Sequence, residues 1–378
     1  MDTFALMAIP FFVLAGEIMA RGGMARKLIN FARLLVGWLP GGLAVVNVLS
    51  SMFFGGISGS SVADTSAIGS ILIPAMRERG YDRDYATNLT ITASTQGIII
   101  PPSHNAIIYS LVAGGTASIA QLFVAGIVPG IMVGVSLMIV ALIIAVKRGY
   151  PREPVQNWQE ALKITWDALL ALGSPIIIVG GVVFGWFTAT ESSAIAVLWA
   201  LVVTFLFYRE IPFRRYTQIA LDSMRVIAMV LFLIASASAF GWLLAYLQIP
   251  AKITQALLGV TKNKYLLLLL INLILLGLGM IMDMAPLIII TTPILLPVVQ
   301  SVGVNPVHFG IIMLLNLGIG LCTPPVGSTL FVGCAISGAK IEELVKGIFP
   351  FYGAMLAVLF AVTYLPFLSM GLVHLFFR

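Results

Sequence analysis

The sequence has 378 residues, of which 60% are hydrophobic and only 10% carry a charged side chain. Soluble domains average about 25% charged residues, so this composition and a mean hydropathy of +1.06 exclude an ordinary soluble protein. The formal charge of +6 does not indicate nucleic-acid binding, because the basic residues lie at the ends of apolar segments, as the positive-inside rule predicts. We therefore expect an all-α polytopic membrane protein.

The N-terminal region, residues 1–40, is predicted to hold a membrane helix followed by a surface arm over 24–37. The arm alternates basic and apolar residues at helical spacing, which is typical of a helix lying along the membrane. Two apolar segments follow at 41–54 and 62–76, separated by the glycine- and serine-rich stretch 55–61. Each reaches only about 21–23 Å, short of a hydrocarbon core of about 30 Å. We interpret them as a re-entrant hairpin whose tip lies at mid-membrane.

A helix that starts near Asp84 is predicted to break at Pro101-Pro102, because each proline lacks an N–H group and strains the preceding turn. A similar hairpin and a break at Pro324-Pro325 recur later in the chain. The expected domains are 41–118 for the first hairpin and broken helix, 119–263 for scaffold helices and a second arm, 264–338 for the second hairpin and broken helix, and 339–378 for a C-terminal membrane helix.

The two hairpin units are related by an internal repeat with a constant offset of 223 residues, as between positions 71 and 294. Their identities fall mainly on glycine and proline, which set backbone shape. The loop 77–84 carries three arginines, whereas the equivalent loop 300–307 carries no charged residue. Opposite charge bias places the two loops on opposite membrane faces, so the sequence predicts two inverted-topology repeats, which is typical of secondary transporters.

The hairpin tips and proline breaks are predicted to meet near the bilayer midplane, where broken helices expose free carbonyl and N–H groups. Neutral oxygens of this kind suit a small, hard cation such as Na⁺. For any single hydroxyl, the alternative is a bond to its own helix or simple packing. The hydroxyl and amide candidates are Ser58, Ser60, Ser61, Thr65, Ser103 and Asn105 in the first half, and Thr291, Thr292, Thr323, Ser328 and Thr329 in the second.

Several ionisable residues also lie in apolar segments, where charge is costly and usually functional. Asp64 and Asp283 lie at the two tips, and Asp64 can either ligate a cation through water or cap the second hairpin helix. His104 can bond a substrate carboxylate, carry a proton or pack. Glu17 is a further candidate, whereas Glu191 at a helix start favours a structural role that complements the helix dipole.

One enzymatic alternative is an intramembrane protease of the rhomboid type. Gly56-Ile57-Ser58-Gly59 matches its G-x-S-G pattern, with His104 as a conceivable base. The pattern is weak in a chain with 36 glycines, and a protease does not require the duplicated proline frame. We therefore expect no enzyme.

At these residues the chain resembles the large membrane subunit, DctM type, of tripartite ATP-independent periplasmic (TRAP) transporters. The similarity covers nearly the whole chain. The motif Thr188-Ala189-Thr190-Glu191 resembles the family's T-P-T-E, with Ala189 in place of proline. The motifs are Ala8-Ile9-Pro10-Phe11-Phe12 with Ala15-Gly16-Glu17, Gly59-Ser60-Ser61-Val62-Ala63-Asp64, Gly80-Tyr81, Ile100-Pro101-Pro102-Ser103, Pro129-Gly130 and Thr188-Ala189-Thr190-Glu191.

This resemblance implies an elevator-type carrier of the ion-transporter superfamily in the bacterial inner membrane. It implies Na⁺ coupling without a further cofactor, a small DctQ-type membrane subunit, and a DctP-type periplasmic binding protein that delivers organic acids. Residue by residue, it implies one Na⁺ region at Ser58, Ser60, Ser61, Gly97 and Pro101 to Ser103, and another at the second tip with Gly320 and Thr323 to Pro325.

Two departures from the family pattern affect the expectations. His104-Asn105 stands where many relatives have an apolar residue, so the solute chemistry is expected to differ. The family's first membrane helix is absent, which indicates a truncated reading frame or reliance on a partner. Positions near the tips and breaks, several of which differ between the repeats, are the candidates for contacting the solute: Ser61, Ser103, His104, Asn105, Gly327, Ser328 and Thr329.

The sequence thus predicts the permease subunit of a Na⁺-coupled importer of a carboxylate-containing solute. The alternative is a carrier of the same superfamily that works alone, such as a dicarboxylate or citrate symporter. A channel or a non-transporting scaffold is a third class.

Overall fold

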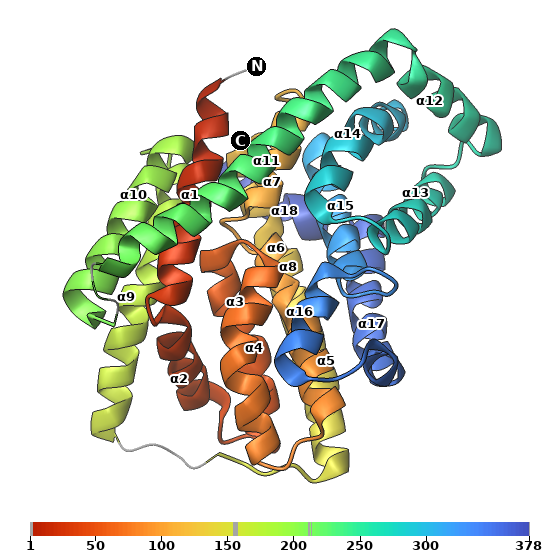
Figure 1. Ribbon diagram of the computed structural model, residues 1–378. Coiled ribbons are helices and arrows are strands. Elements are labelled where there is room, and N and C mark those ends of the chain that lie inside the picture. Colours follow the sequence, from red (N-terminus) through yellow and green to blue (C-terminus); the bar gives the residue numbers. More distant parts are fainter. Residues whose placement is uncertain (1–2, 154–157, 211, 213, 378) are drawn as a thin grey trace.

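The computed structural model describes residues 3–153, 158–210, 212 and 214–377, and this part of the chain forms helices and no strand (Figure 1). Six of the described helices are long and apolar enough to cross a bilayer, which confirms a polytopic helical membrane protein. They are α8 (Ile119–Arg148), α9 (Trp158–Val183), α10 (Ala189–Val202) with its π-helical continuation η1 (Val203–Tyr208), α11 (Arg214–Tyr246), α14 (Met284–Ser301) and α17 (Ile341–Tyr364).

The expected N-terminal helix and arm are present as α1 (Thr3–Arg21) and α2 (Met24–Val36). The two axes differ by 66°, and Gly23 between them has φ 80°, a conformation that glycine adopts readily. One face of α2 is buried against α3 and α9. The helix predicted over 24–37 therefore exists, while its position along the membrane surface stays a prediction.

The two predicted hairpins are also present. The first consists of α3 (Gly42–Ser58) and α4 (Ser61–Glu78), and the second of α13 (Lys264–Gly279) and α14. At the first tip the chain reverses through Gly59, whose φ is 62°, and Ser60 then caps α4 by accepting a hydrogen bond from the Ala63 N–H.

Both helices that were predicted to break at a proline pair do so. The first consists of α5 (Arg83–Ser94), the short α6 (Gln96–Ile99) and α7 (His104–Val112), and the second of α15 (Pro306–Leu321) and α16 (Ser328–Ser337). The bonds Pro101-Pro102 and Pro324-Pro325 are both cis, so the two breaks share this backbone feature.

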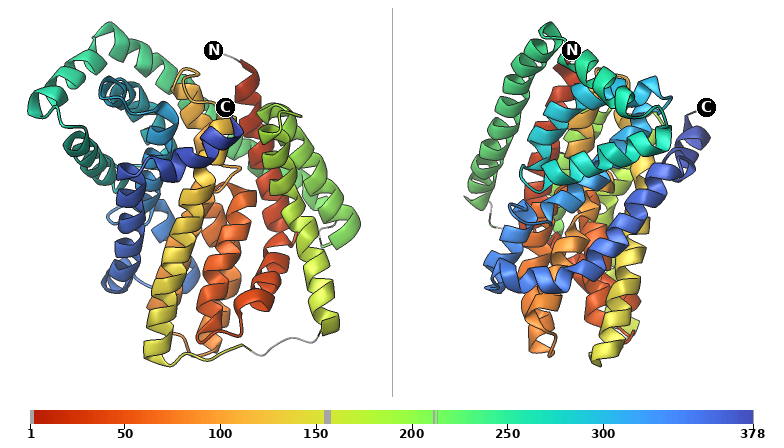
Figure 2. Two further views of the ribbon diagram at one scale, coloured as in Figure 1. Left: turned by 180° about the vertical axis from the view of Figure 1, so that it is seen from behind. Right: turned by 90° about the vertical axis from the view of Figure 1, so that its right-hand side faces the viewer.

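The two broken helices run in opposite directions. Arg83 at the start of α5 donates to the carbonyl of Gly338, just beyond α16, at 3.3 Å. Tyr109 in α7 donates to the carbonyl of Pro306, at the start of α15, at 2.6 Å. Each broken helix therefore begins where the other ends. The loop after α4 lies at the lower end of the molecule, whereas α18, which lines a pocket together with the loop after α14, lies higher up (Figures 1 and 2). Inverted repeats require this arrangement, although the symmetry relation itself stays a prediction.

The remaining helices surround these two units. The long helix α8 packs against α3 and α17 and thus contacts both halves, whereas α1 packs against α10 and α11 on another side. After α11 the chain turns into α12 (Ile249–Val260), a helix with no buried side chain among its described residues, at the place expected for the second arm. The C-terminal helix α18 (Phe367–Phe376) packs on α8. One large apolar cluster runs through both halves and fixes the hairpins against the broken helices.

Candidate functional site

Each hairpin tip touches the broken helix of its own half through a pair of glycines. A Cβ atom at Gly55 would lie 2.5 Å from the Gly97 Cα atom, and one at Gly320 would lie 2.7 Å from the backbone of Gly279. Only residues without a side chain permit two backbones to approach this closely. Each predicted tip therefore lies against the broken helix of its own half, while their position near the bilayer midplane stays a prediction.

A chain of hydroxyl groups joins the first tip to both broken helices. The Ser61 Oγ atom lies 2.8 Å from Ser94 Oγ in α5 and 2.9 Å from Thr329 Oγ1 in α16. Thr65 donates to the same Ser94 hydroxyl at 2.8 Å. Ser61, Thr65 and Thr329, which were predicted from different parts of the sequence, thus lie together and are buried.

Two other predicted serines cap helix starts, and a third, Ser58, lies at the end of α3. The hydroxyls of Ser60 and Ser103 each accept a hydrogen bond at 3.4 Å from a backbone N–H one turn ahead, so they cap α4 and α7. Ser58 Oγ lies 3.3 Å from both the backbone nitrogen and the carbonyl oxygen of Ser60. All three serines therefore form hydrogen bonds with near neighbours in the chain, in addition to any role in binding an ion.

Asp64 is fully buried, and neither of its carboxylate oxygens has a hydrogen-bond partner within the described residues. The expectation that Asp64 caps the second hairpin helix is wrong, because Ser60 is the cap and Asp64 lies one turn further into α4. Ser51 of α3 interacts with this carboxylate, although the two side chains do not form an aligned hydrogen bond. A buried carboxylate without a partner is costly, so it marks a place for a cation or a proton.

Further buried oxygens without partners come from the same region. They belong to α3 of the first hairpin and to α5 and α6 of the first broken helix. Sequence reasoning missed these residues because no glycine or proline marks them. Besides Asp64, the oxygens of this region without a partner in the described chain are Asn47 Oδ1, Ser50 Oγ, Ser51 Oγ, Asn88 Oδ1 and Gln96 Oε1. Buried polar atoms in folded proteins are nearly always paired, so these oxygens can take up further polar partners. They are spread over the first half, since Gln96 Oε1 lies beside Gly134 of α8 and the Asn88 amide donates to the Leu344 carbonyl of α17.

Residues from the two halves also meet beside the breaks. His104 at the start of α7 is half-buried, and a Cβ atom at Gly59 would lie 3.3 Å from its Nδ1 atom. Asp283 at the second tip acts electrostatically on this imidazole and accepts a hydrogen bond from Ser328 at 3.0 Å. The neighbouring Asn105 is buried. Four of the predicted solute-binding or ion-binding residues are therefore brought to one side of the breaks.

The threonines predicted in the second half bond mainly within their own helices. Thr291 donates to the Leu287 carbonyl at 2.6 Å, and Thr323 donates to the Ile319 carbonyl at 2.7 Å. Thr292 lies 3.5 Å from the Met313 sulfur atom. The structure thus places Thr291 and Thr292 in α14 against α15 rather than at the tip. Besides the bond between Ser328 and Asp283, a backbone bond from Val326 N–H to Met280 O at 3.0 Å joins this tip to its break.

Two predicted intramembrane glutamates have structural partners. Glu191 and Thr188 form a reciprocal capping box at the start of α10, as expected for a structural role. Glu17 pairs with Arg21, which also contacts Asp222 of α11 at 2.7 Å. Neither glutamate belongs to the tip and break region.

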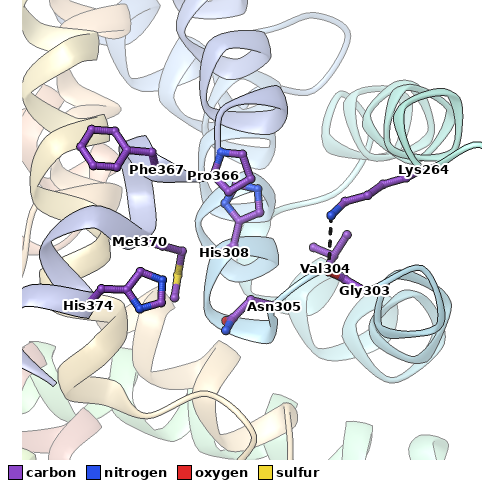
Figure 3. Close-up of a pocket in the computed structure, with 9 residues that line it drawn as sticks. All are labelled: Lys264, Gly303, Val304, Asn305, His308, Pro366, Phe367, Met370 and His374. Atoms are coloured by element: carbon purple, nitrogen blue, oxygen red, sulfur yellow. Dashed lines mark hydrogen bonds between the residues drawn. The ribbon is translucent and has the colours of Figure 1, made fainter. Parts of the chain in front are cut away.

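A surface pocket of about 340 Å³ lies elsewhere, between the starts of α13 and α15 and the helix α18 (Figure 3). Lys264 reaches into it and donates to the Gly303 carbonyl at 3.3 Å, while His308 and His374 line the other side. His308 Nδ1 lies 2.6 Å from the Ser369 hydroxyl. Because none of the tip residues lines this pocket, it is separate from the candidate site.

Comparisons with known proteins agree with this architecture. The uncharacterized protein YgiK of Salmonella typhimurium is 45% identical over 376 residues, which cover 100% of this chain and 86% of YgiK. The isethionate TRAP transporter permease protein DctMQ of Oleidesulfovibrio alaskensis is 42% identical, with 98% of this chain and 58% of that protein covered. The sialic acid TRAP transporter large permease protein SiaM of Vibrio cholerae is 36% identical, with 99% and 87% covered.

A solved structure has the same fold. It is the YdaH transporter of Alcanivorax borkumensis, with a TM-score of 0.68 and 16% identity over 98% of this chain and 86% of that chain. The family model of the tripartite ATP-independent periplasmic transporter, DctM component, matches residues 1–368. The chain therefore belongs to the DctM family, the large permease component of TRAP transporters.

Proposed function

We propose that this protein is the permease subunit of a Na⁺-coupled TRAP transporter that imports a carboxylate-containing organic solute. Membership of the DctM family makes it a membrane transport protein that imports organic acids, rather than an enzyme. The protease alternative is not carried forward, since the Ser58 hydroxyl bonds with Ser60 rather than with His104. The coupling ion and the class of solute form the proposal.

The buried Asp64 carboxylate, which has Ser51 beside it and no hydrogen-bond partner in the described chain, supports the Na⁺ coupling most directly. The carboxylate of Asp64 and the hydroxyl of Ser51 match the preference of a hard cation for oxygen. Na⁺ bound here would neutralise the carboxylate and supply partners to oxygens that otherwise have none. The first proposed Na⁺ region comprises Asp64 together with the residues expected from the sequence, which are Ser58, Ser60, Ser61, Gly97, Pro101 and Ser103.

A second Na⁺ region is proposed at the other tip. Here the backbone is the main source of ligands, because the Gly279–Gly320 contact and the break before Pro325 leave helix-end carbonyls near one another. Asp283 adds the only carboxylate among the described residues of this tip, and the Thr323 hydroxyl lies at the end of α15. Thr291 and Thr292 are placed further from the tip and are the weakest of the predicted ligands.

The solute is proposed to bind between these two regions. His104, Asn105 and Ser103 lie on the first half, while Gly327, Ser328 and Thr329 lie on the second, and His104 faces the charge of Asp283. Hydrogen-bond donors at the start of α7 suit an acidic group, because a helix N-terminus favours negative charge. The relatives named for sialic acid and isethionate transport both act on organic acids.

We further propose an elevator-type movement of the two hairpins and broken helices against a scaffold of α1, α2 and α9 to α12. The glycine contacts tie each hairpin to its broken helix. Ion pairs connect scaffold helices with one another, from Arg21 in α1 to Asp222 in α11 and from Lys27 in α2 to Asp167 in α9. These ties within each group support the proposed division into a moving body and a scaffold.

Two partners and a location complete the proposal. A tripartite transporter has further components, which we propose to be a small DctQ-type membrane subunit and a DctP-type periplasmic binding protein, in the bacterial inner membrane. Large apolar side chains of α11, such as Met224, Met229 and Phe232, are exposed in the isolated chain and provide a surface for the small subunit. The DctMQ relative supports this pairing, since this chain covers only 58% of it.

Solute uptake into proteoliposomes tests the function. The vesicles contain this protein with its small subunit, and the binding protein loaded with a candidate organic acid is added outside. We expect uptake with an inward Na⁺ gradient and none when K⁺ replaces Na⁺. Uptake that follows a proton gradient and ignores Na⁺ would refute the coupling, and uptake without the binding protein would instead support a stand-alone symporter.

A further inference from the structure

A second surface pocket lies at the end of the molecule opposite to the pocket of Figure 3. It has a volume of about 280 Å³ and lies where the start of α5, the end of α8 and the start of α17 come together. Three cations line it, namely Lys147 and Arg148 of α8 and Lys346 of α17, against one carboxylate, Asp84. The pocket therefore carries an excess of positive charge.

The contacts within the pocket show which of these charges are free. Arg148 is held by an ion pair with Asp82 at 2.6 Å and lies over the Tyr85 ring, with its guanidinium carbon 5.6 Å from the ring centre. Lys147 and Lys346 form no ion pair within the described part of the chain. Once Arg148 is balanced by Asp82, two lysines face Asp84, so one singly charged anion would neutralise the pocket.

An apolar stripe leads along α8 to the same place. Its members are exposed by 44 to 56% although they are large and hydrophobic, and their spacing of four or three residues puts them on one face of the helix. They are Ile131, Val135, Ile139, Ile143 and Val146. The stripe ends directly at Lys147. The stripe extends for about 22 Å along the helix axis. One leaflet contributes about 15 Å, half of the hydrocarbon core of about 30 Å, so the stripe is long enough to contact the full length of an acyl chain in that leaflet.

The charge distribution assigns this pocket to the cytoplasmic leaflet. Asp82, the partner of Arg148, belongs to the arginine-rich loop after α4, and such loops remain on the cytoplasmic side. Basic pockets between membrane helices on that side are suited to anionic lipid headgroups. A soluble anion would use the lysines alone, whereas a lipid would also cover the apolar stripe.

We propose that this pocket binds the phosphodiester headgroup of an anionic phospholipid whose acyl chains lie along the α8 stripe. The lipid bridges the cytoplasmic ends of α5, α8 and α17, which come from three separate parts of the chain. This site goes beyond the proposed transport function, because it uses none of the residues that would bind Na⁺ or the solute.

Lipid binding to the purified full-length chain in detergent tests the proposal without Na⁺ or solute present. The probes are phosphatidylglycerol, phosphatidylcholine and inorganic phosphate, and the readouts are bound lipid by native mass spectrometry and the shift in melting temperature. We expect phosphatidylglycerol to bind and stabilise more than the other two. The double variant Lys147→Gln/Lys346→Gln should bind it about 30-fold more weakly, the effect of two charges at a membrane surface.

Two further variants separate the possible outcomes. Arg77→Gln removes an exposed cation from the end of α4, outside the pocket, and should leave lipid binding unchanged. Ile139→Ser/Ile143→Ser should weaken phosphatidylglycerol without changing the response to phosphate. Equal stabilisation by phosphate and phosphatidylglycerol would overturn the lipid assignment in favour of a small-anion site, and unchanged lipid binding by the lysine variant would overturn the pocket itself.

Discussion

The Asp64→Asn variant addresses the proposed coupling site most sharply. The substitution keeps the shape of the side chain and removes its charge at a position where the carboxylate is fully buried and has no hydrogen-bond partner in the described chain. In the absence of Na⁺ the variant should therefore be as stable as the parent or more stable, since the cost of burying a charge disappears. In the presence of Na⁺ it should lose the stabilisation that the bound ion provides.

The size of the effect follows from the electrostatic interaction that is removed. For a cation about 5 Å from the carboxylate, as with one intervening water, and an effective dielectric constant near 20, the attraction is about 3 kcal/mol. A loss of that size corresponds to an affinity about a hundredfold weaker. The Na⁺ concentration needed for half-maximal uptake should rise accordingly.

The assay combines two Na⁺ titrations, one of the melting temperature of the purified protein and one of solute uptake in proteoliposomes. Glu78→Gln is the matched control, because Glu78 is an exposed acid at the end of the same helix. In both titrations the Na⁺ concentration at half-maximal effect should rise for Asp64→Asn and should stay unchanged for Glu78→Gln. A variant that folds, transports and responds to Na⁺ like the parent would refute the assignment of Asp64 to an ion site.

Two more predictions concern the backbone frame. Gly320→Ala should destabilise the protein by about 1–3 kcal/mol through overpacking, since the new methyl group meets the backbone of Gly279. The control is Gly277→Ala in α13, the helix that also holds Gly279. Its new methyl group meets no atom within 4 Å, so this variant should melt like the parent. Thr188→Ala removes half of the capping box with Glu191, so its free energy of unfolding in a urea titration in detergent should fall by about 1 kcal/mol while the Na⁺ dependence of uptake stays unchanged. A parent-like melting curve for Gly320→Ala, or an altered Na⁺ dependence for Thr188→Ala, would contradict this account.

The two halves share a backbone plan but differ in how their buried polar groups are satisfied. Around the first hairpin, Asp64 and several neighbouring side-chain oxygens lack partners in the described chain. In the second half Thr291 and Thr323 bond to their own helices, whereas Thr329 bonds with Ser61 of the first half. The second tip is joined to its break by a backbone bond from Val326 to Met280 and by the bond between Ser328 and Asp283. The first ion region would thus depend mainly on side chains and the second on carbonyls, so substitutions should affect the first region more strongly.

The sequence alone determined the positions of the two hairpins and the two breaks, because glycine, proline and segment length act on the backbone locally. It did not predict that residues 339–378 form two helices, α17 and α18, rather than one. It also indicated the structural role of Glu191, whose partner Thr188 lies three residues away. Only the tertiary structure decided which hydroxyls meet, since Ser61 reaches Ser94 and Thr329 across 33 and 268 residues of chain. It likewise showed that Asp64 is not a helix cap. Such contacts depend on the rotation and crossing of packed helices, which residue spacing within one segment does not specify.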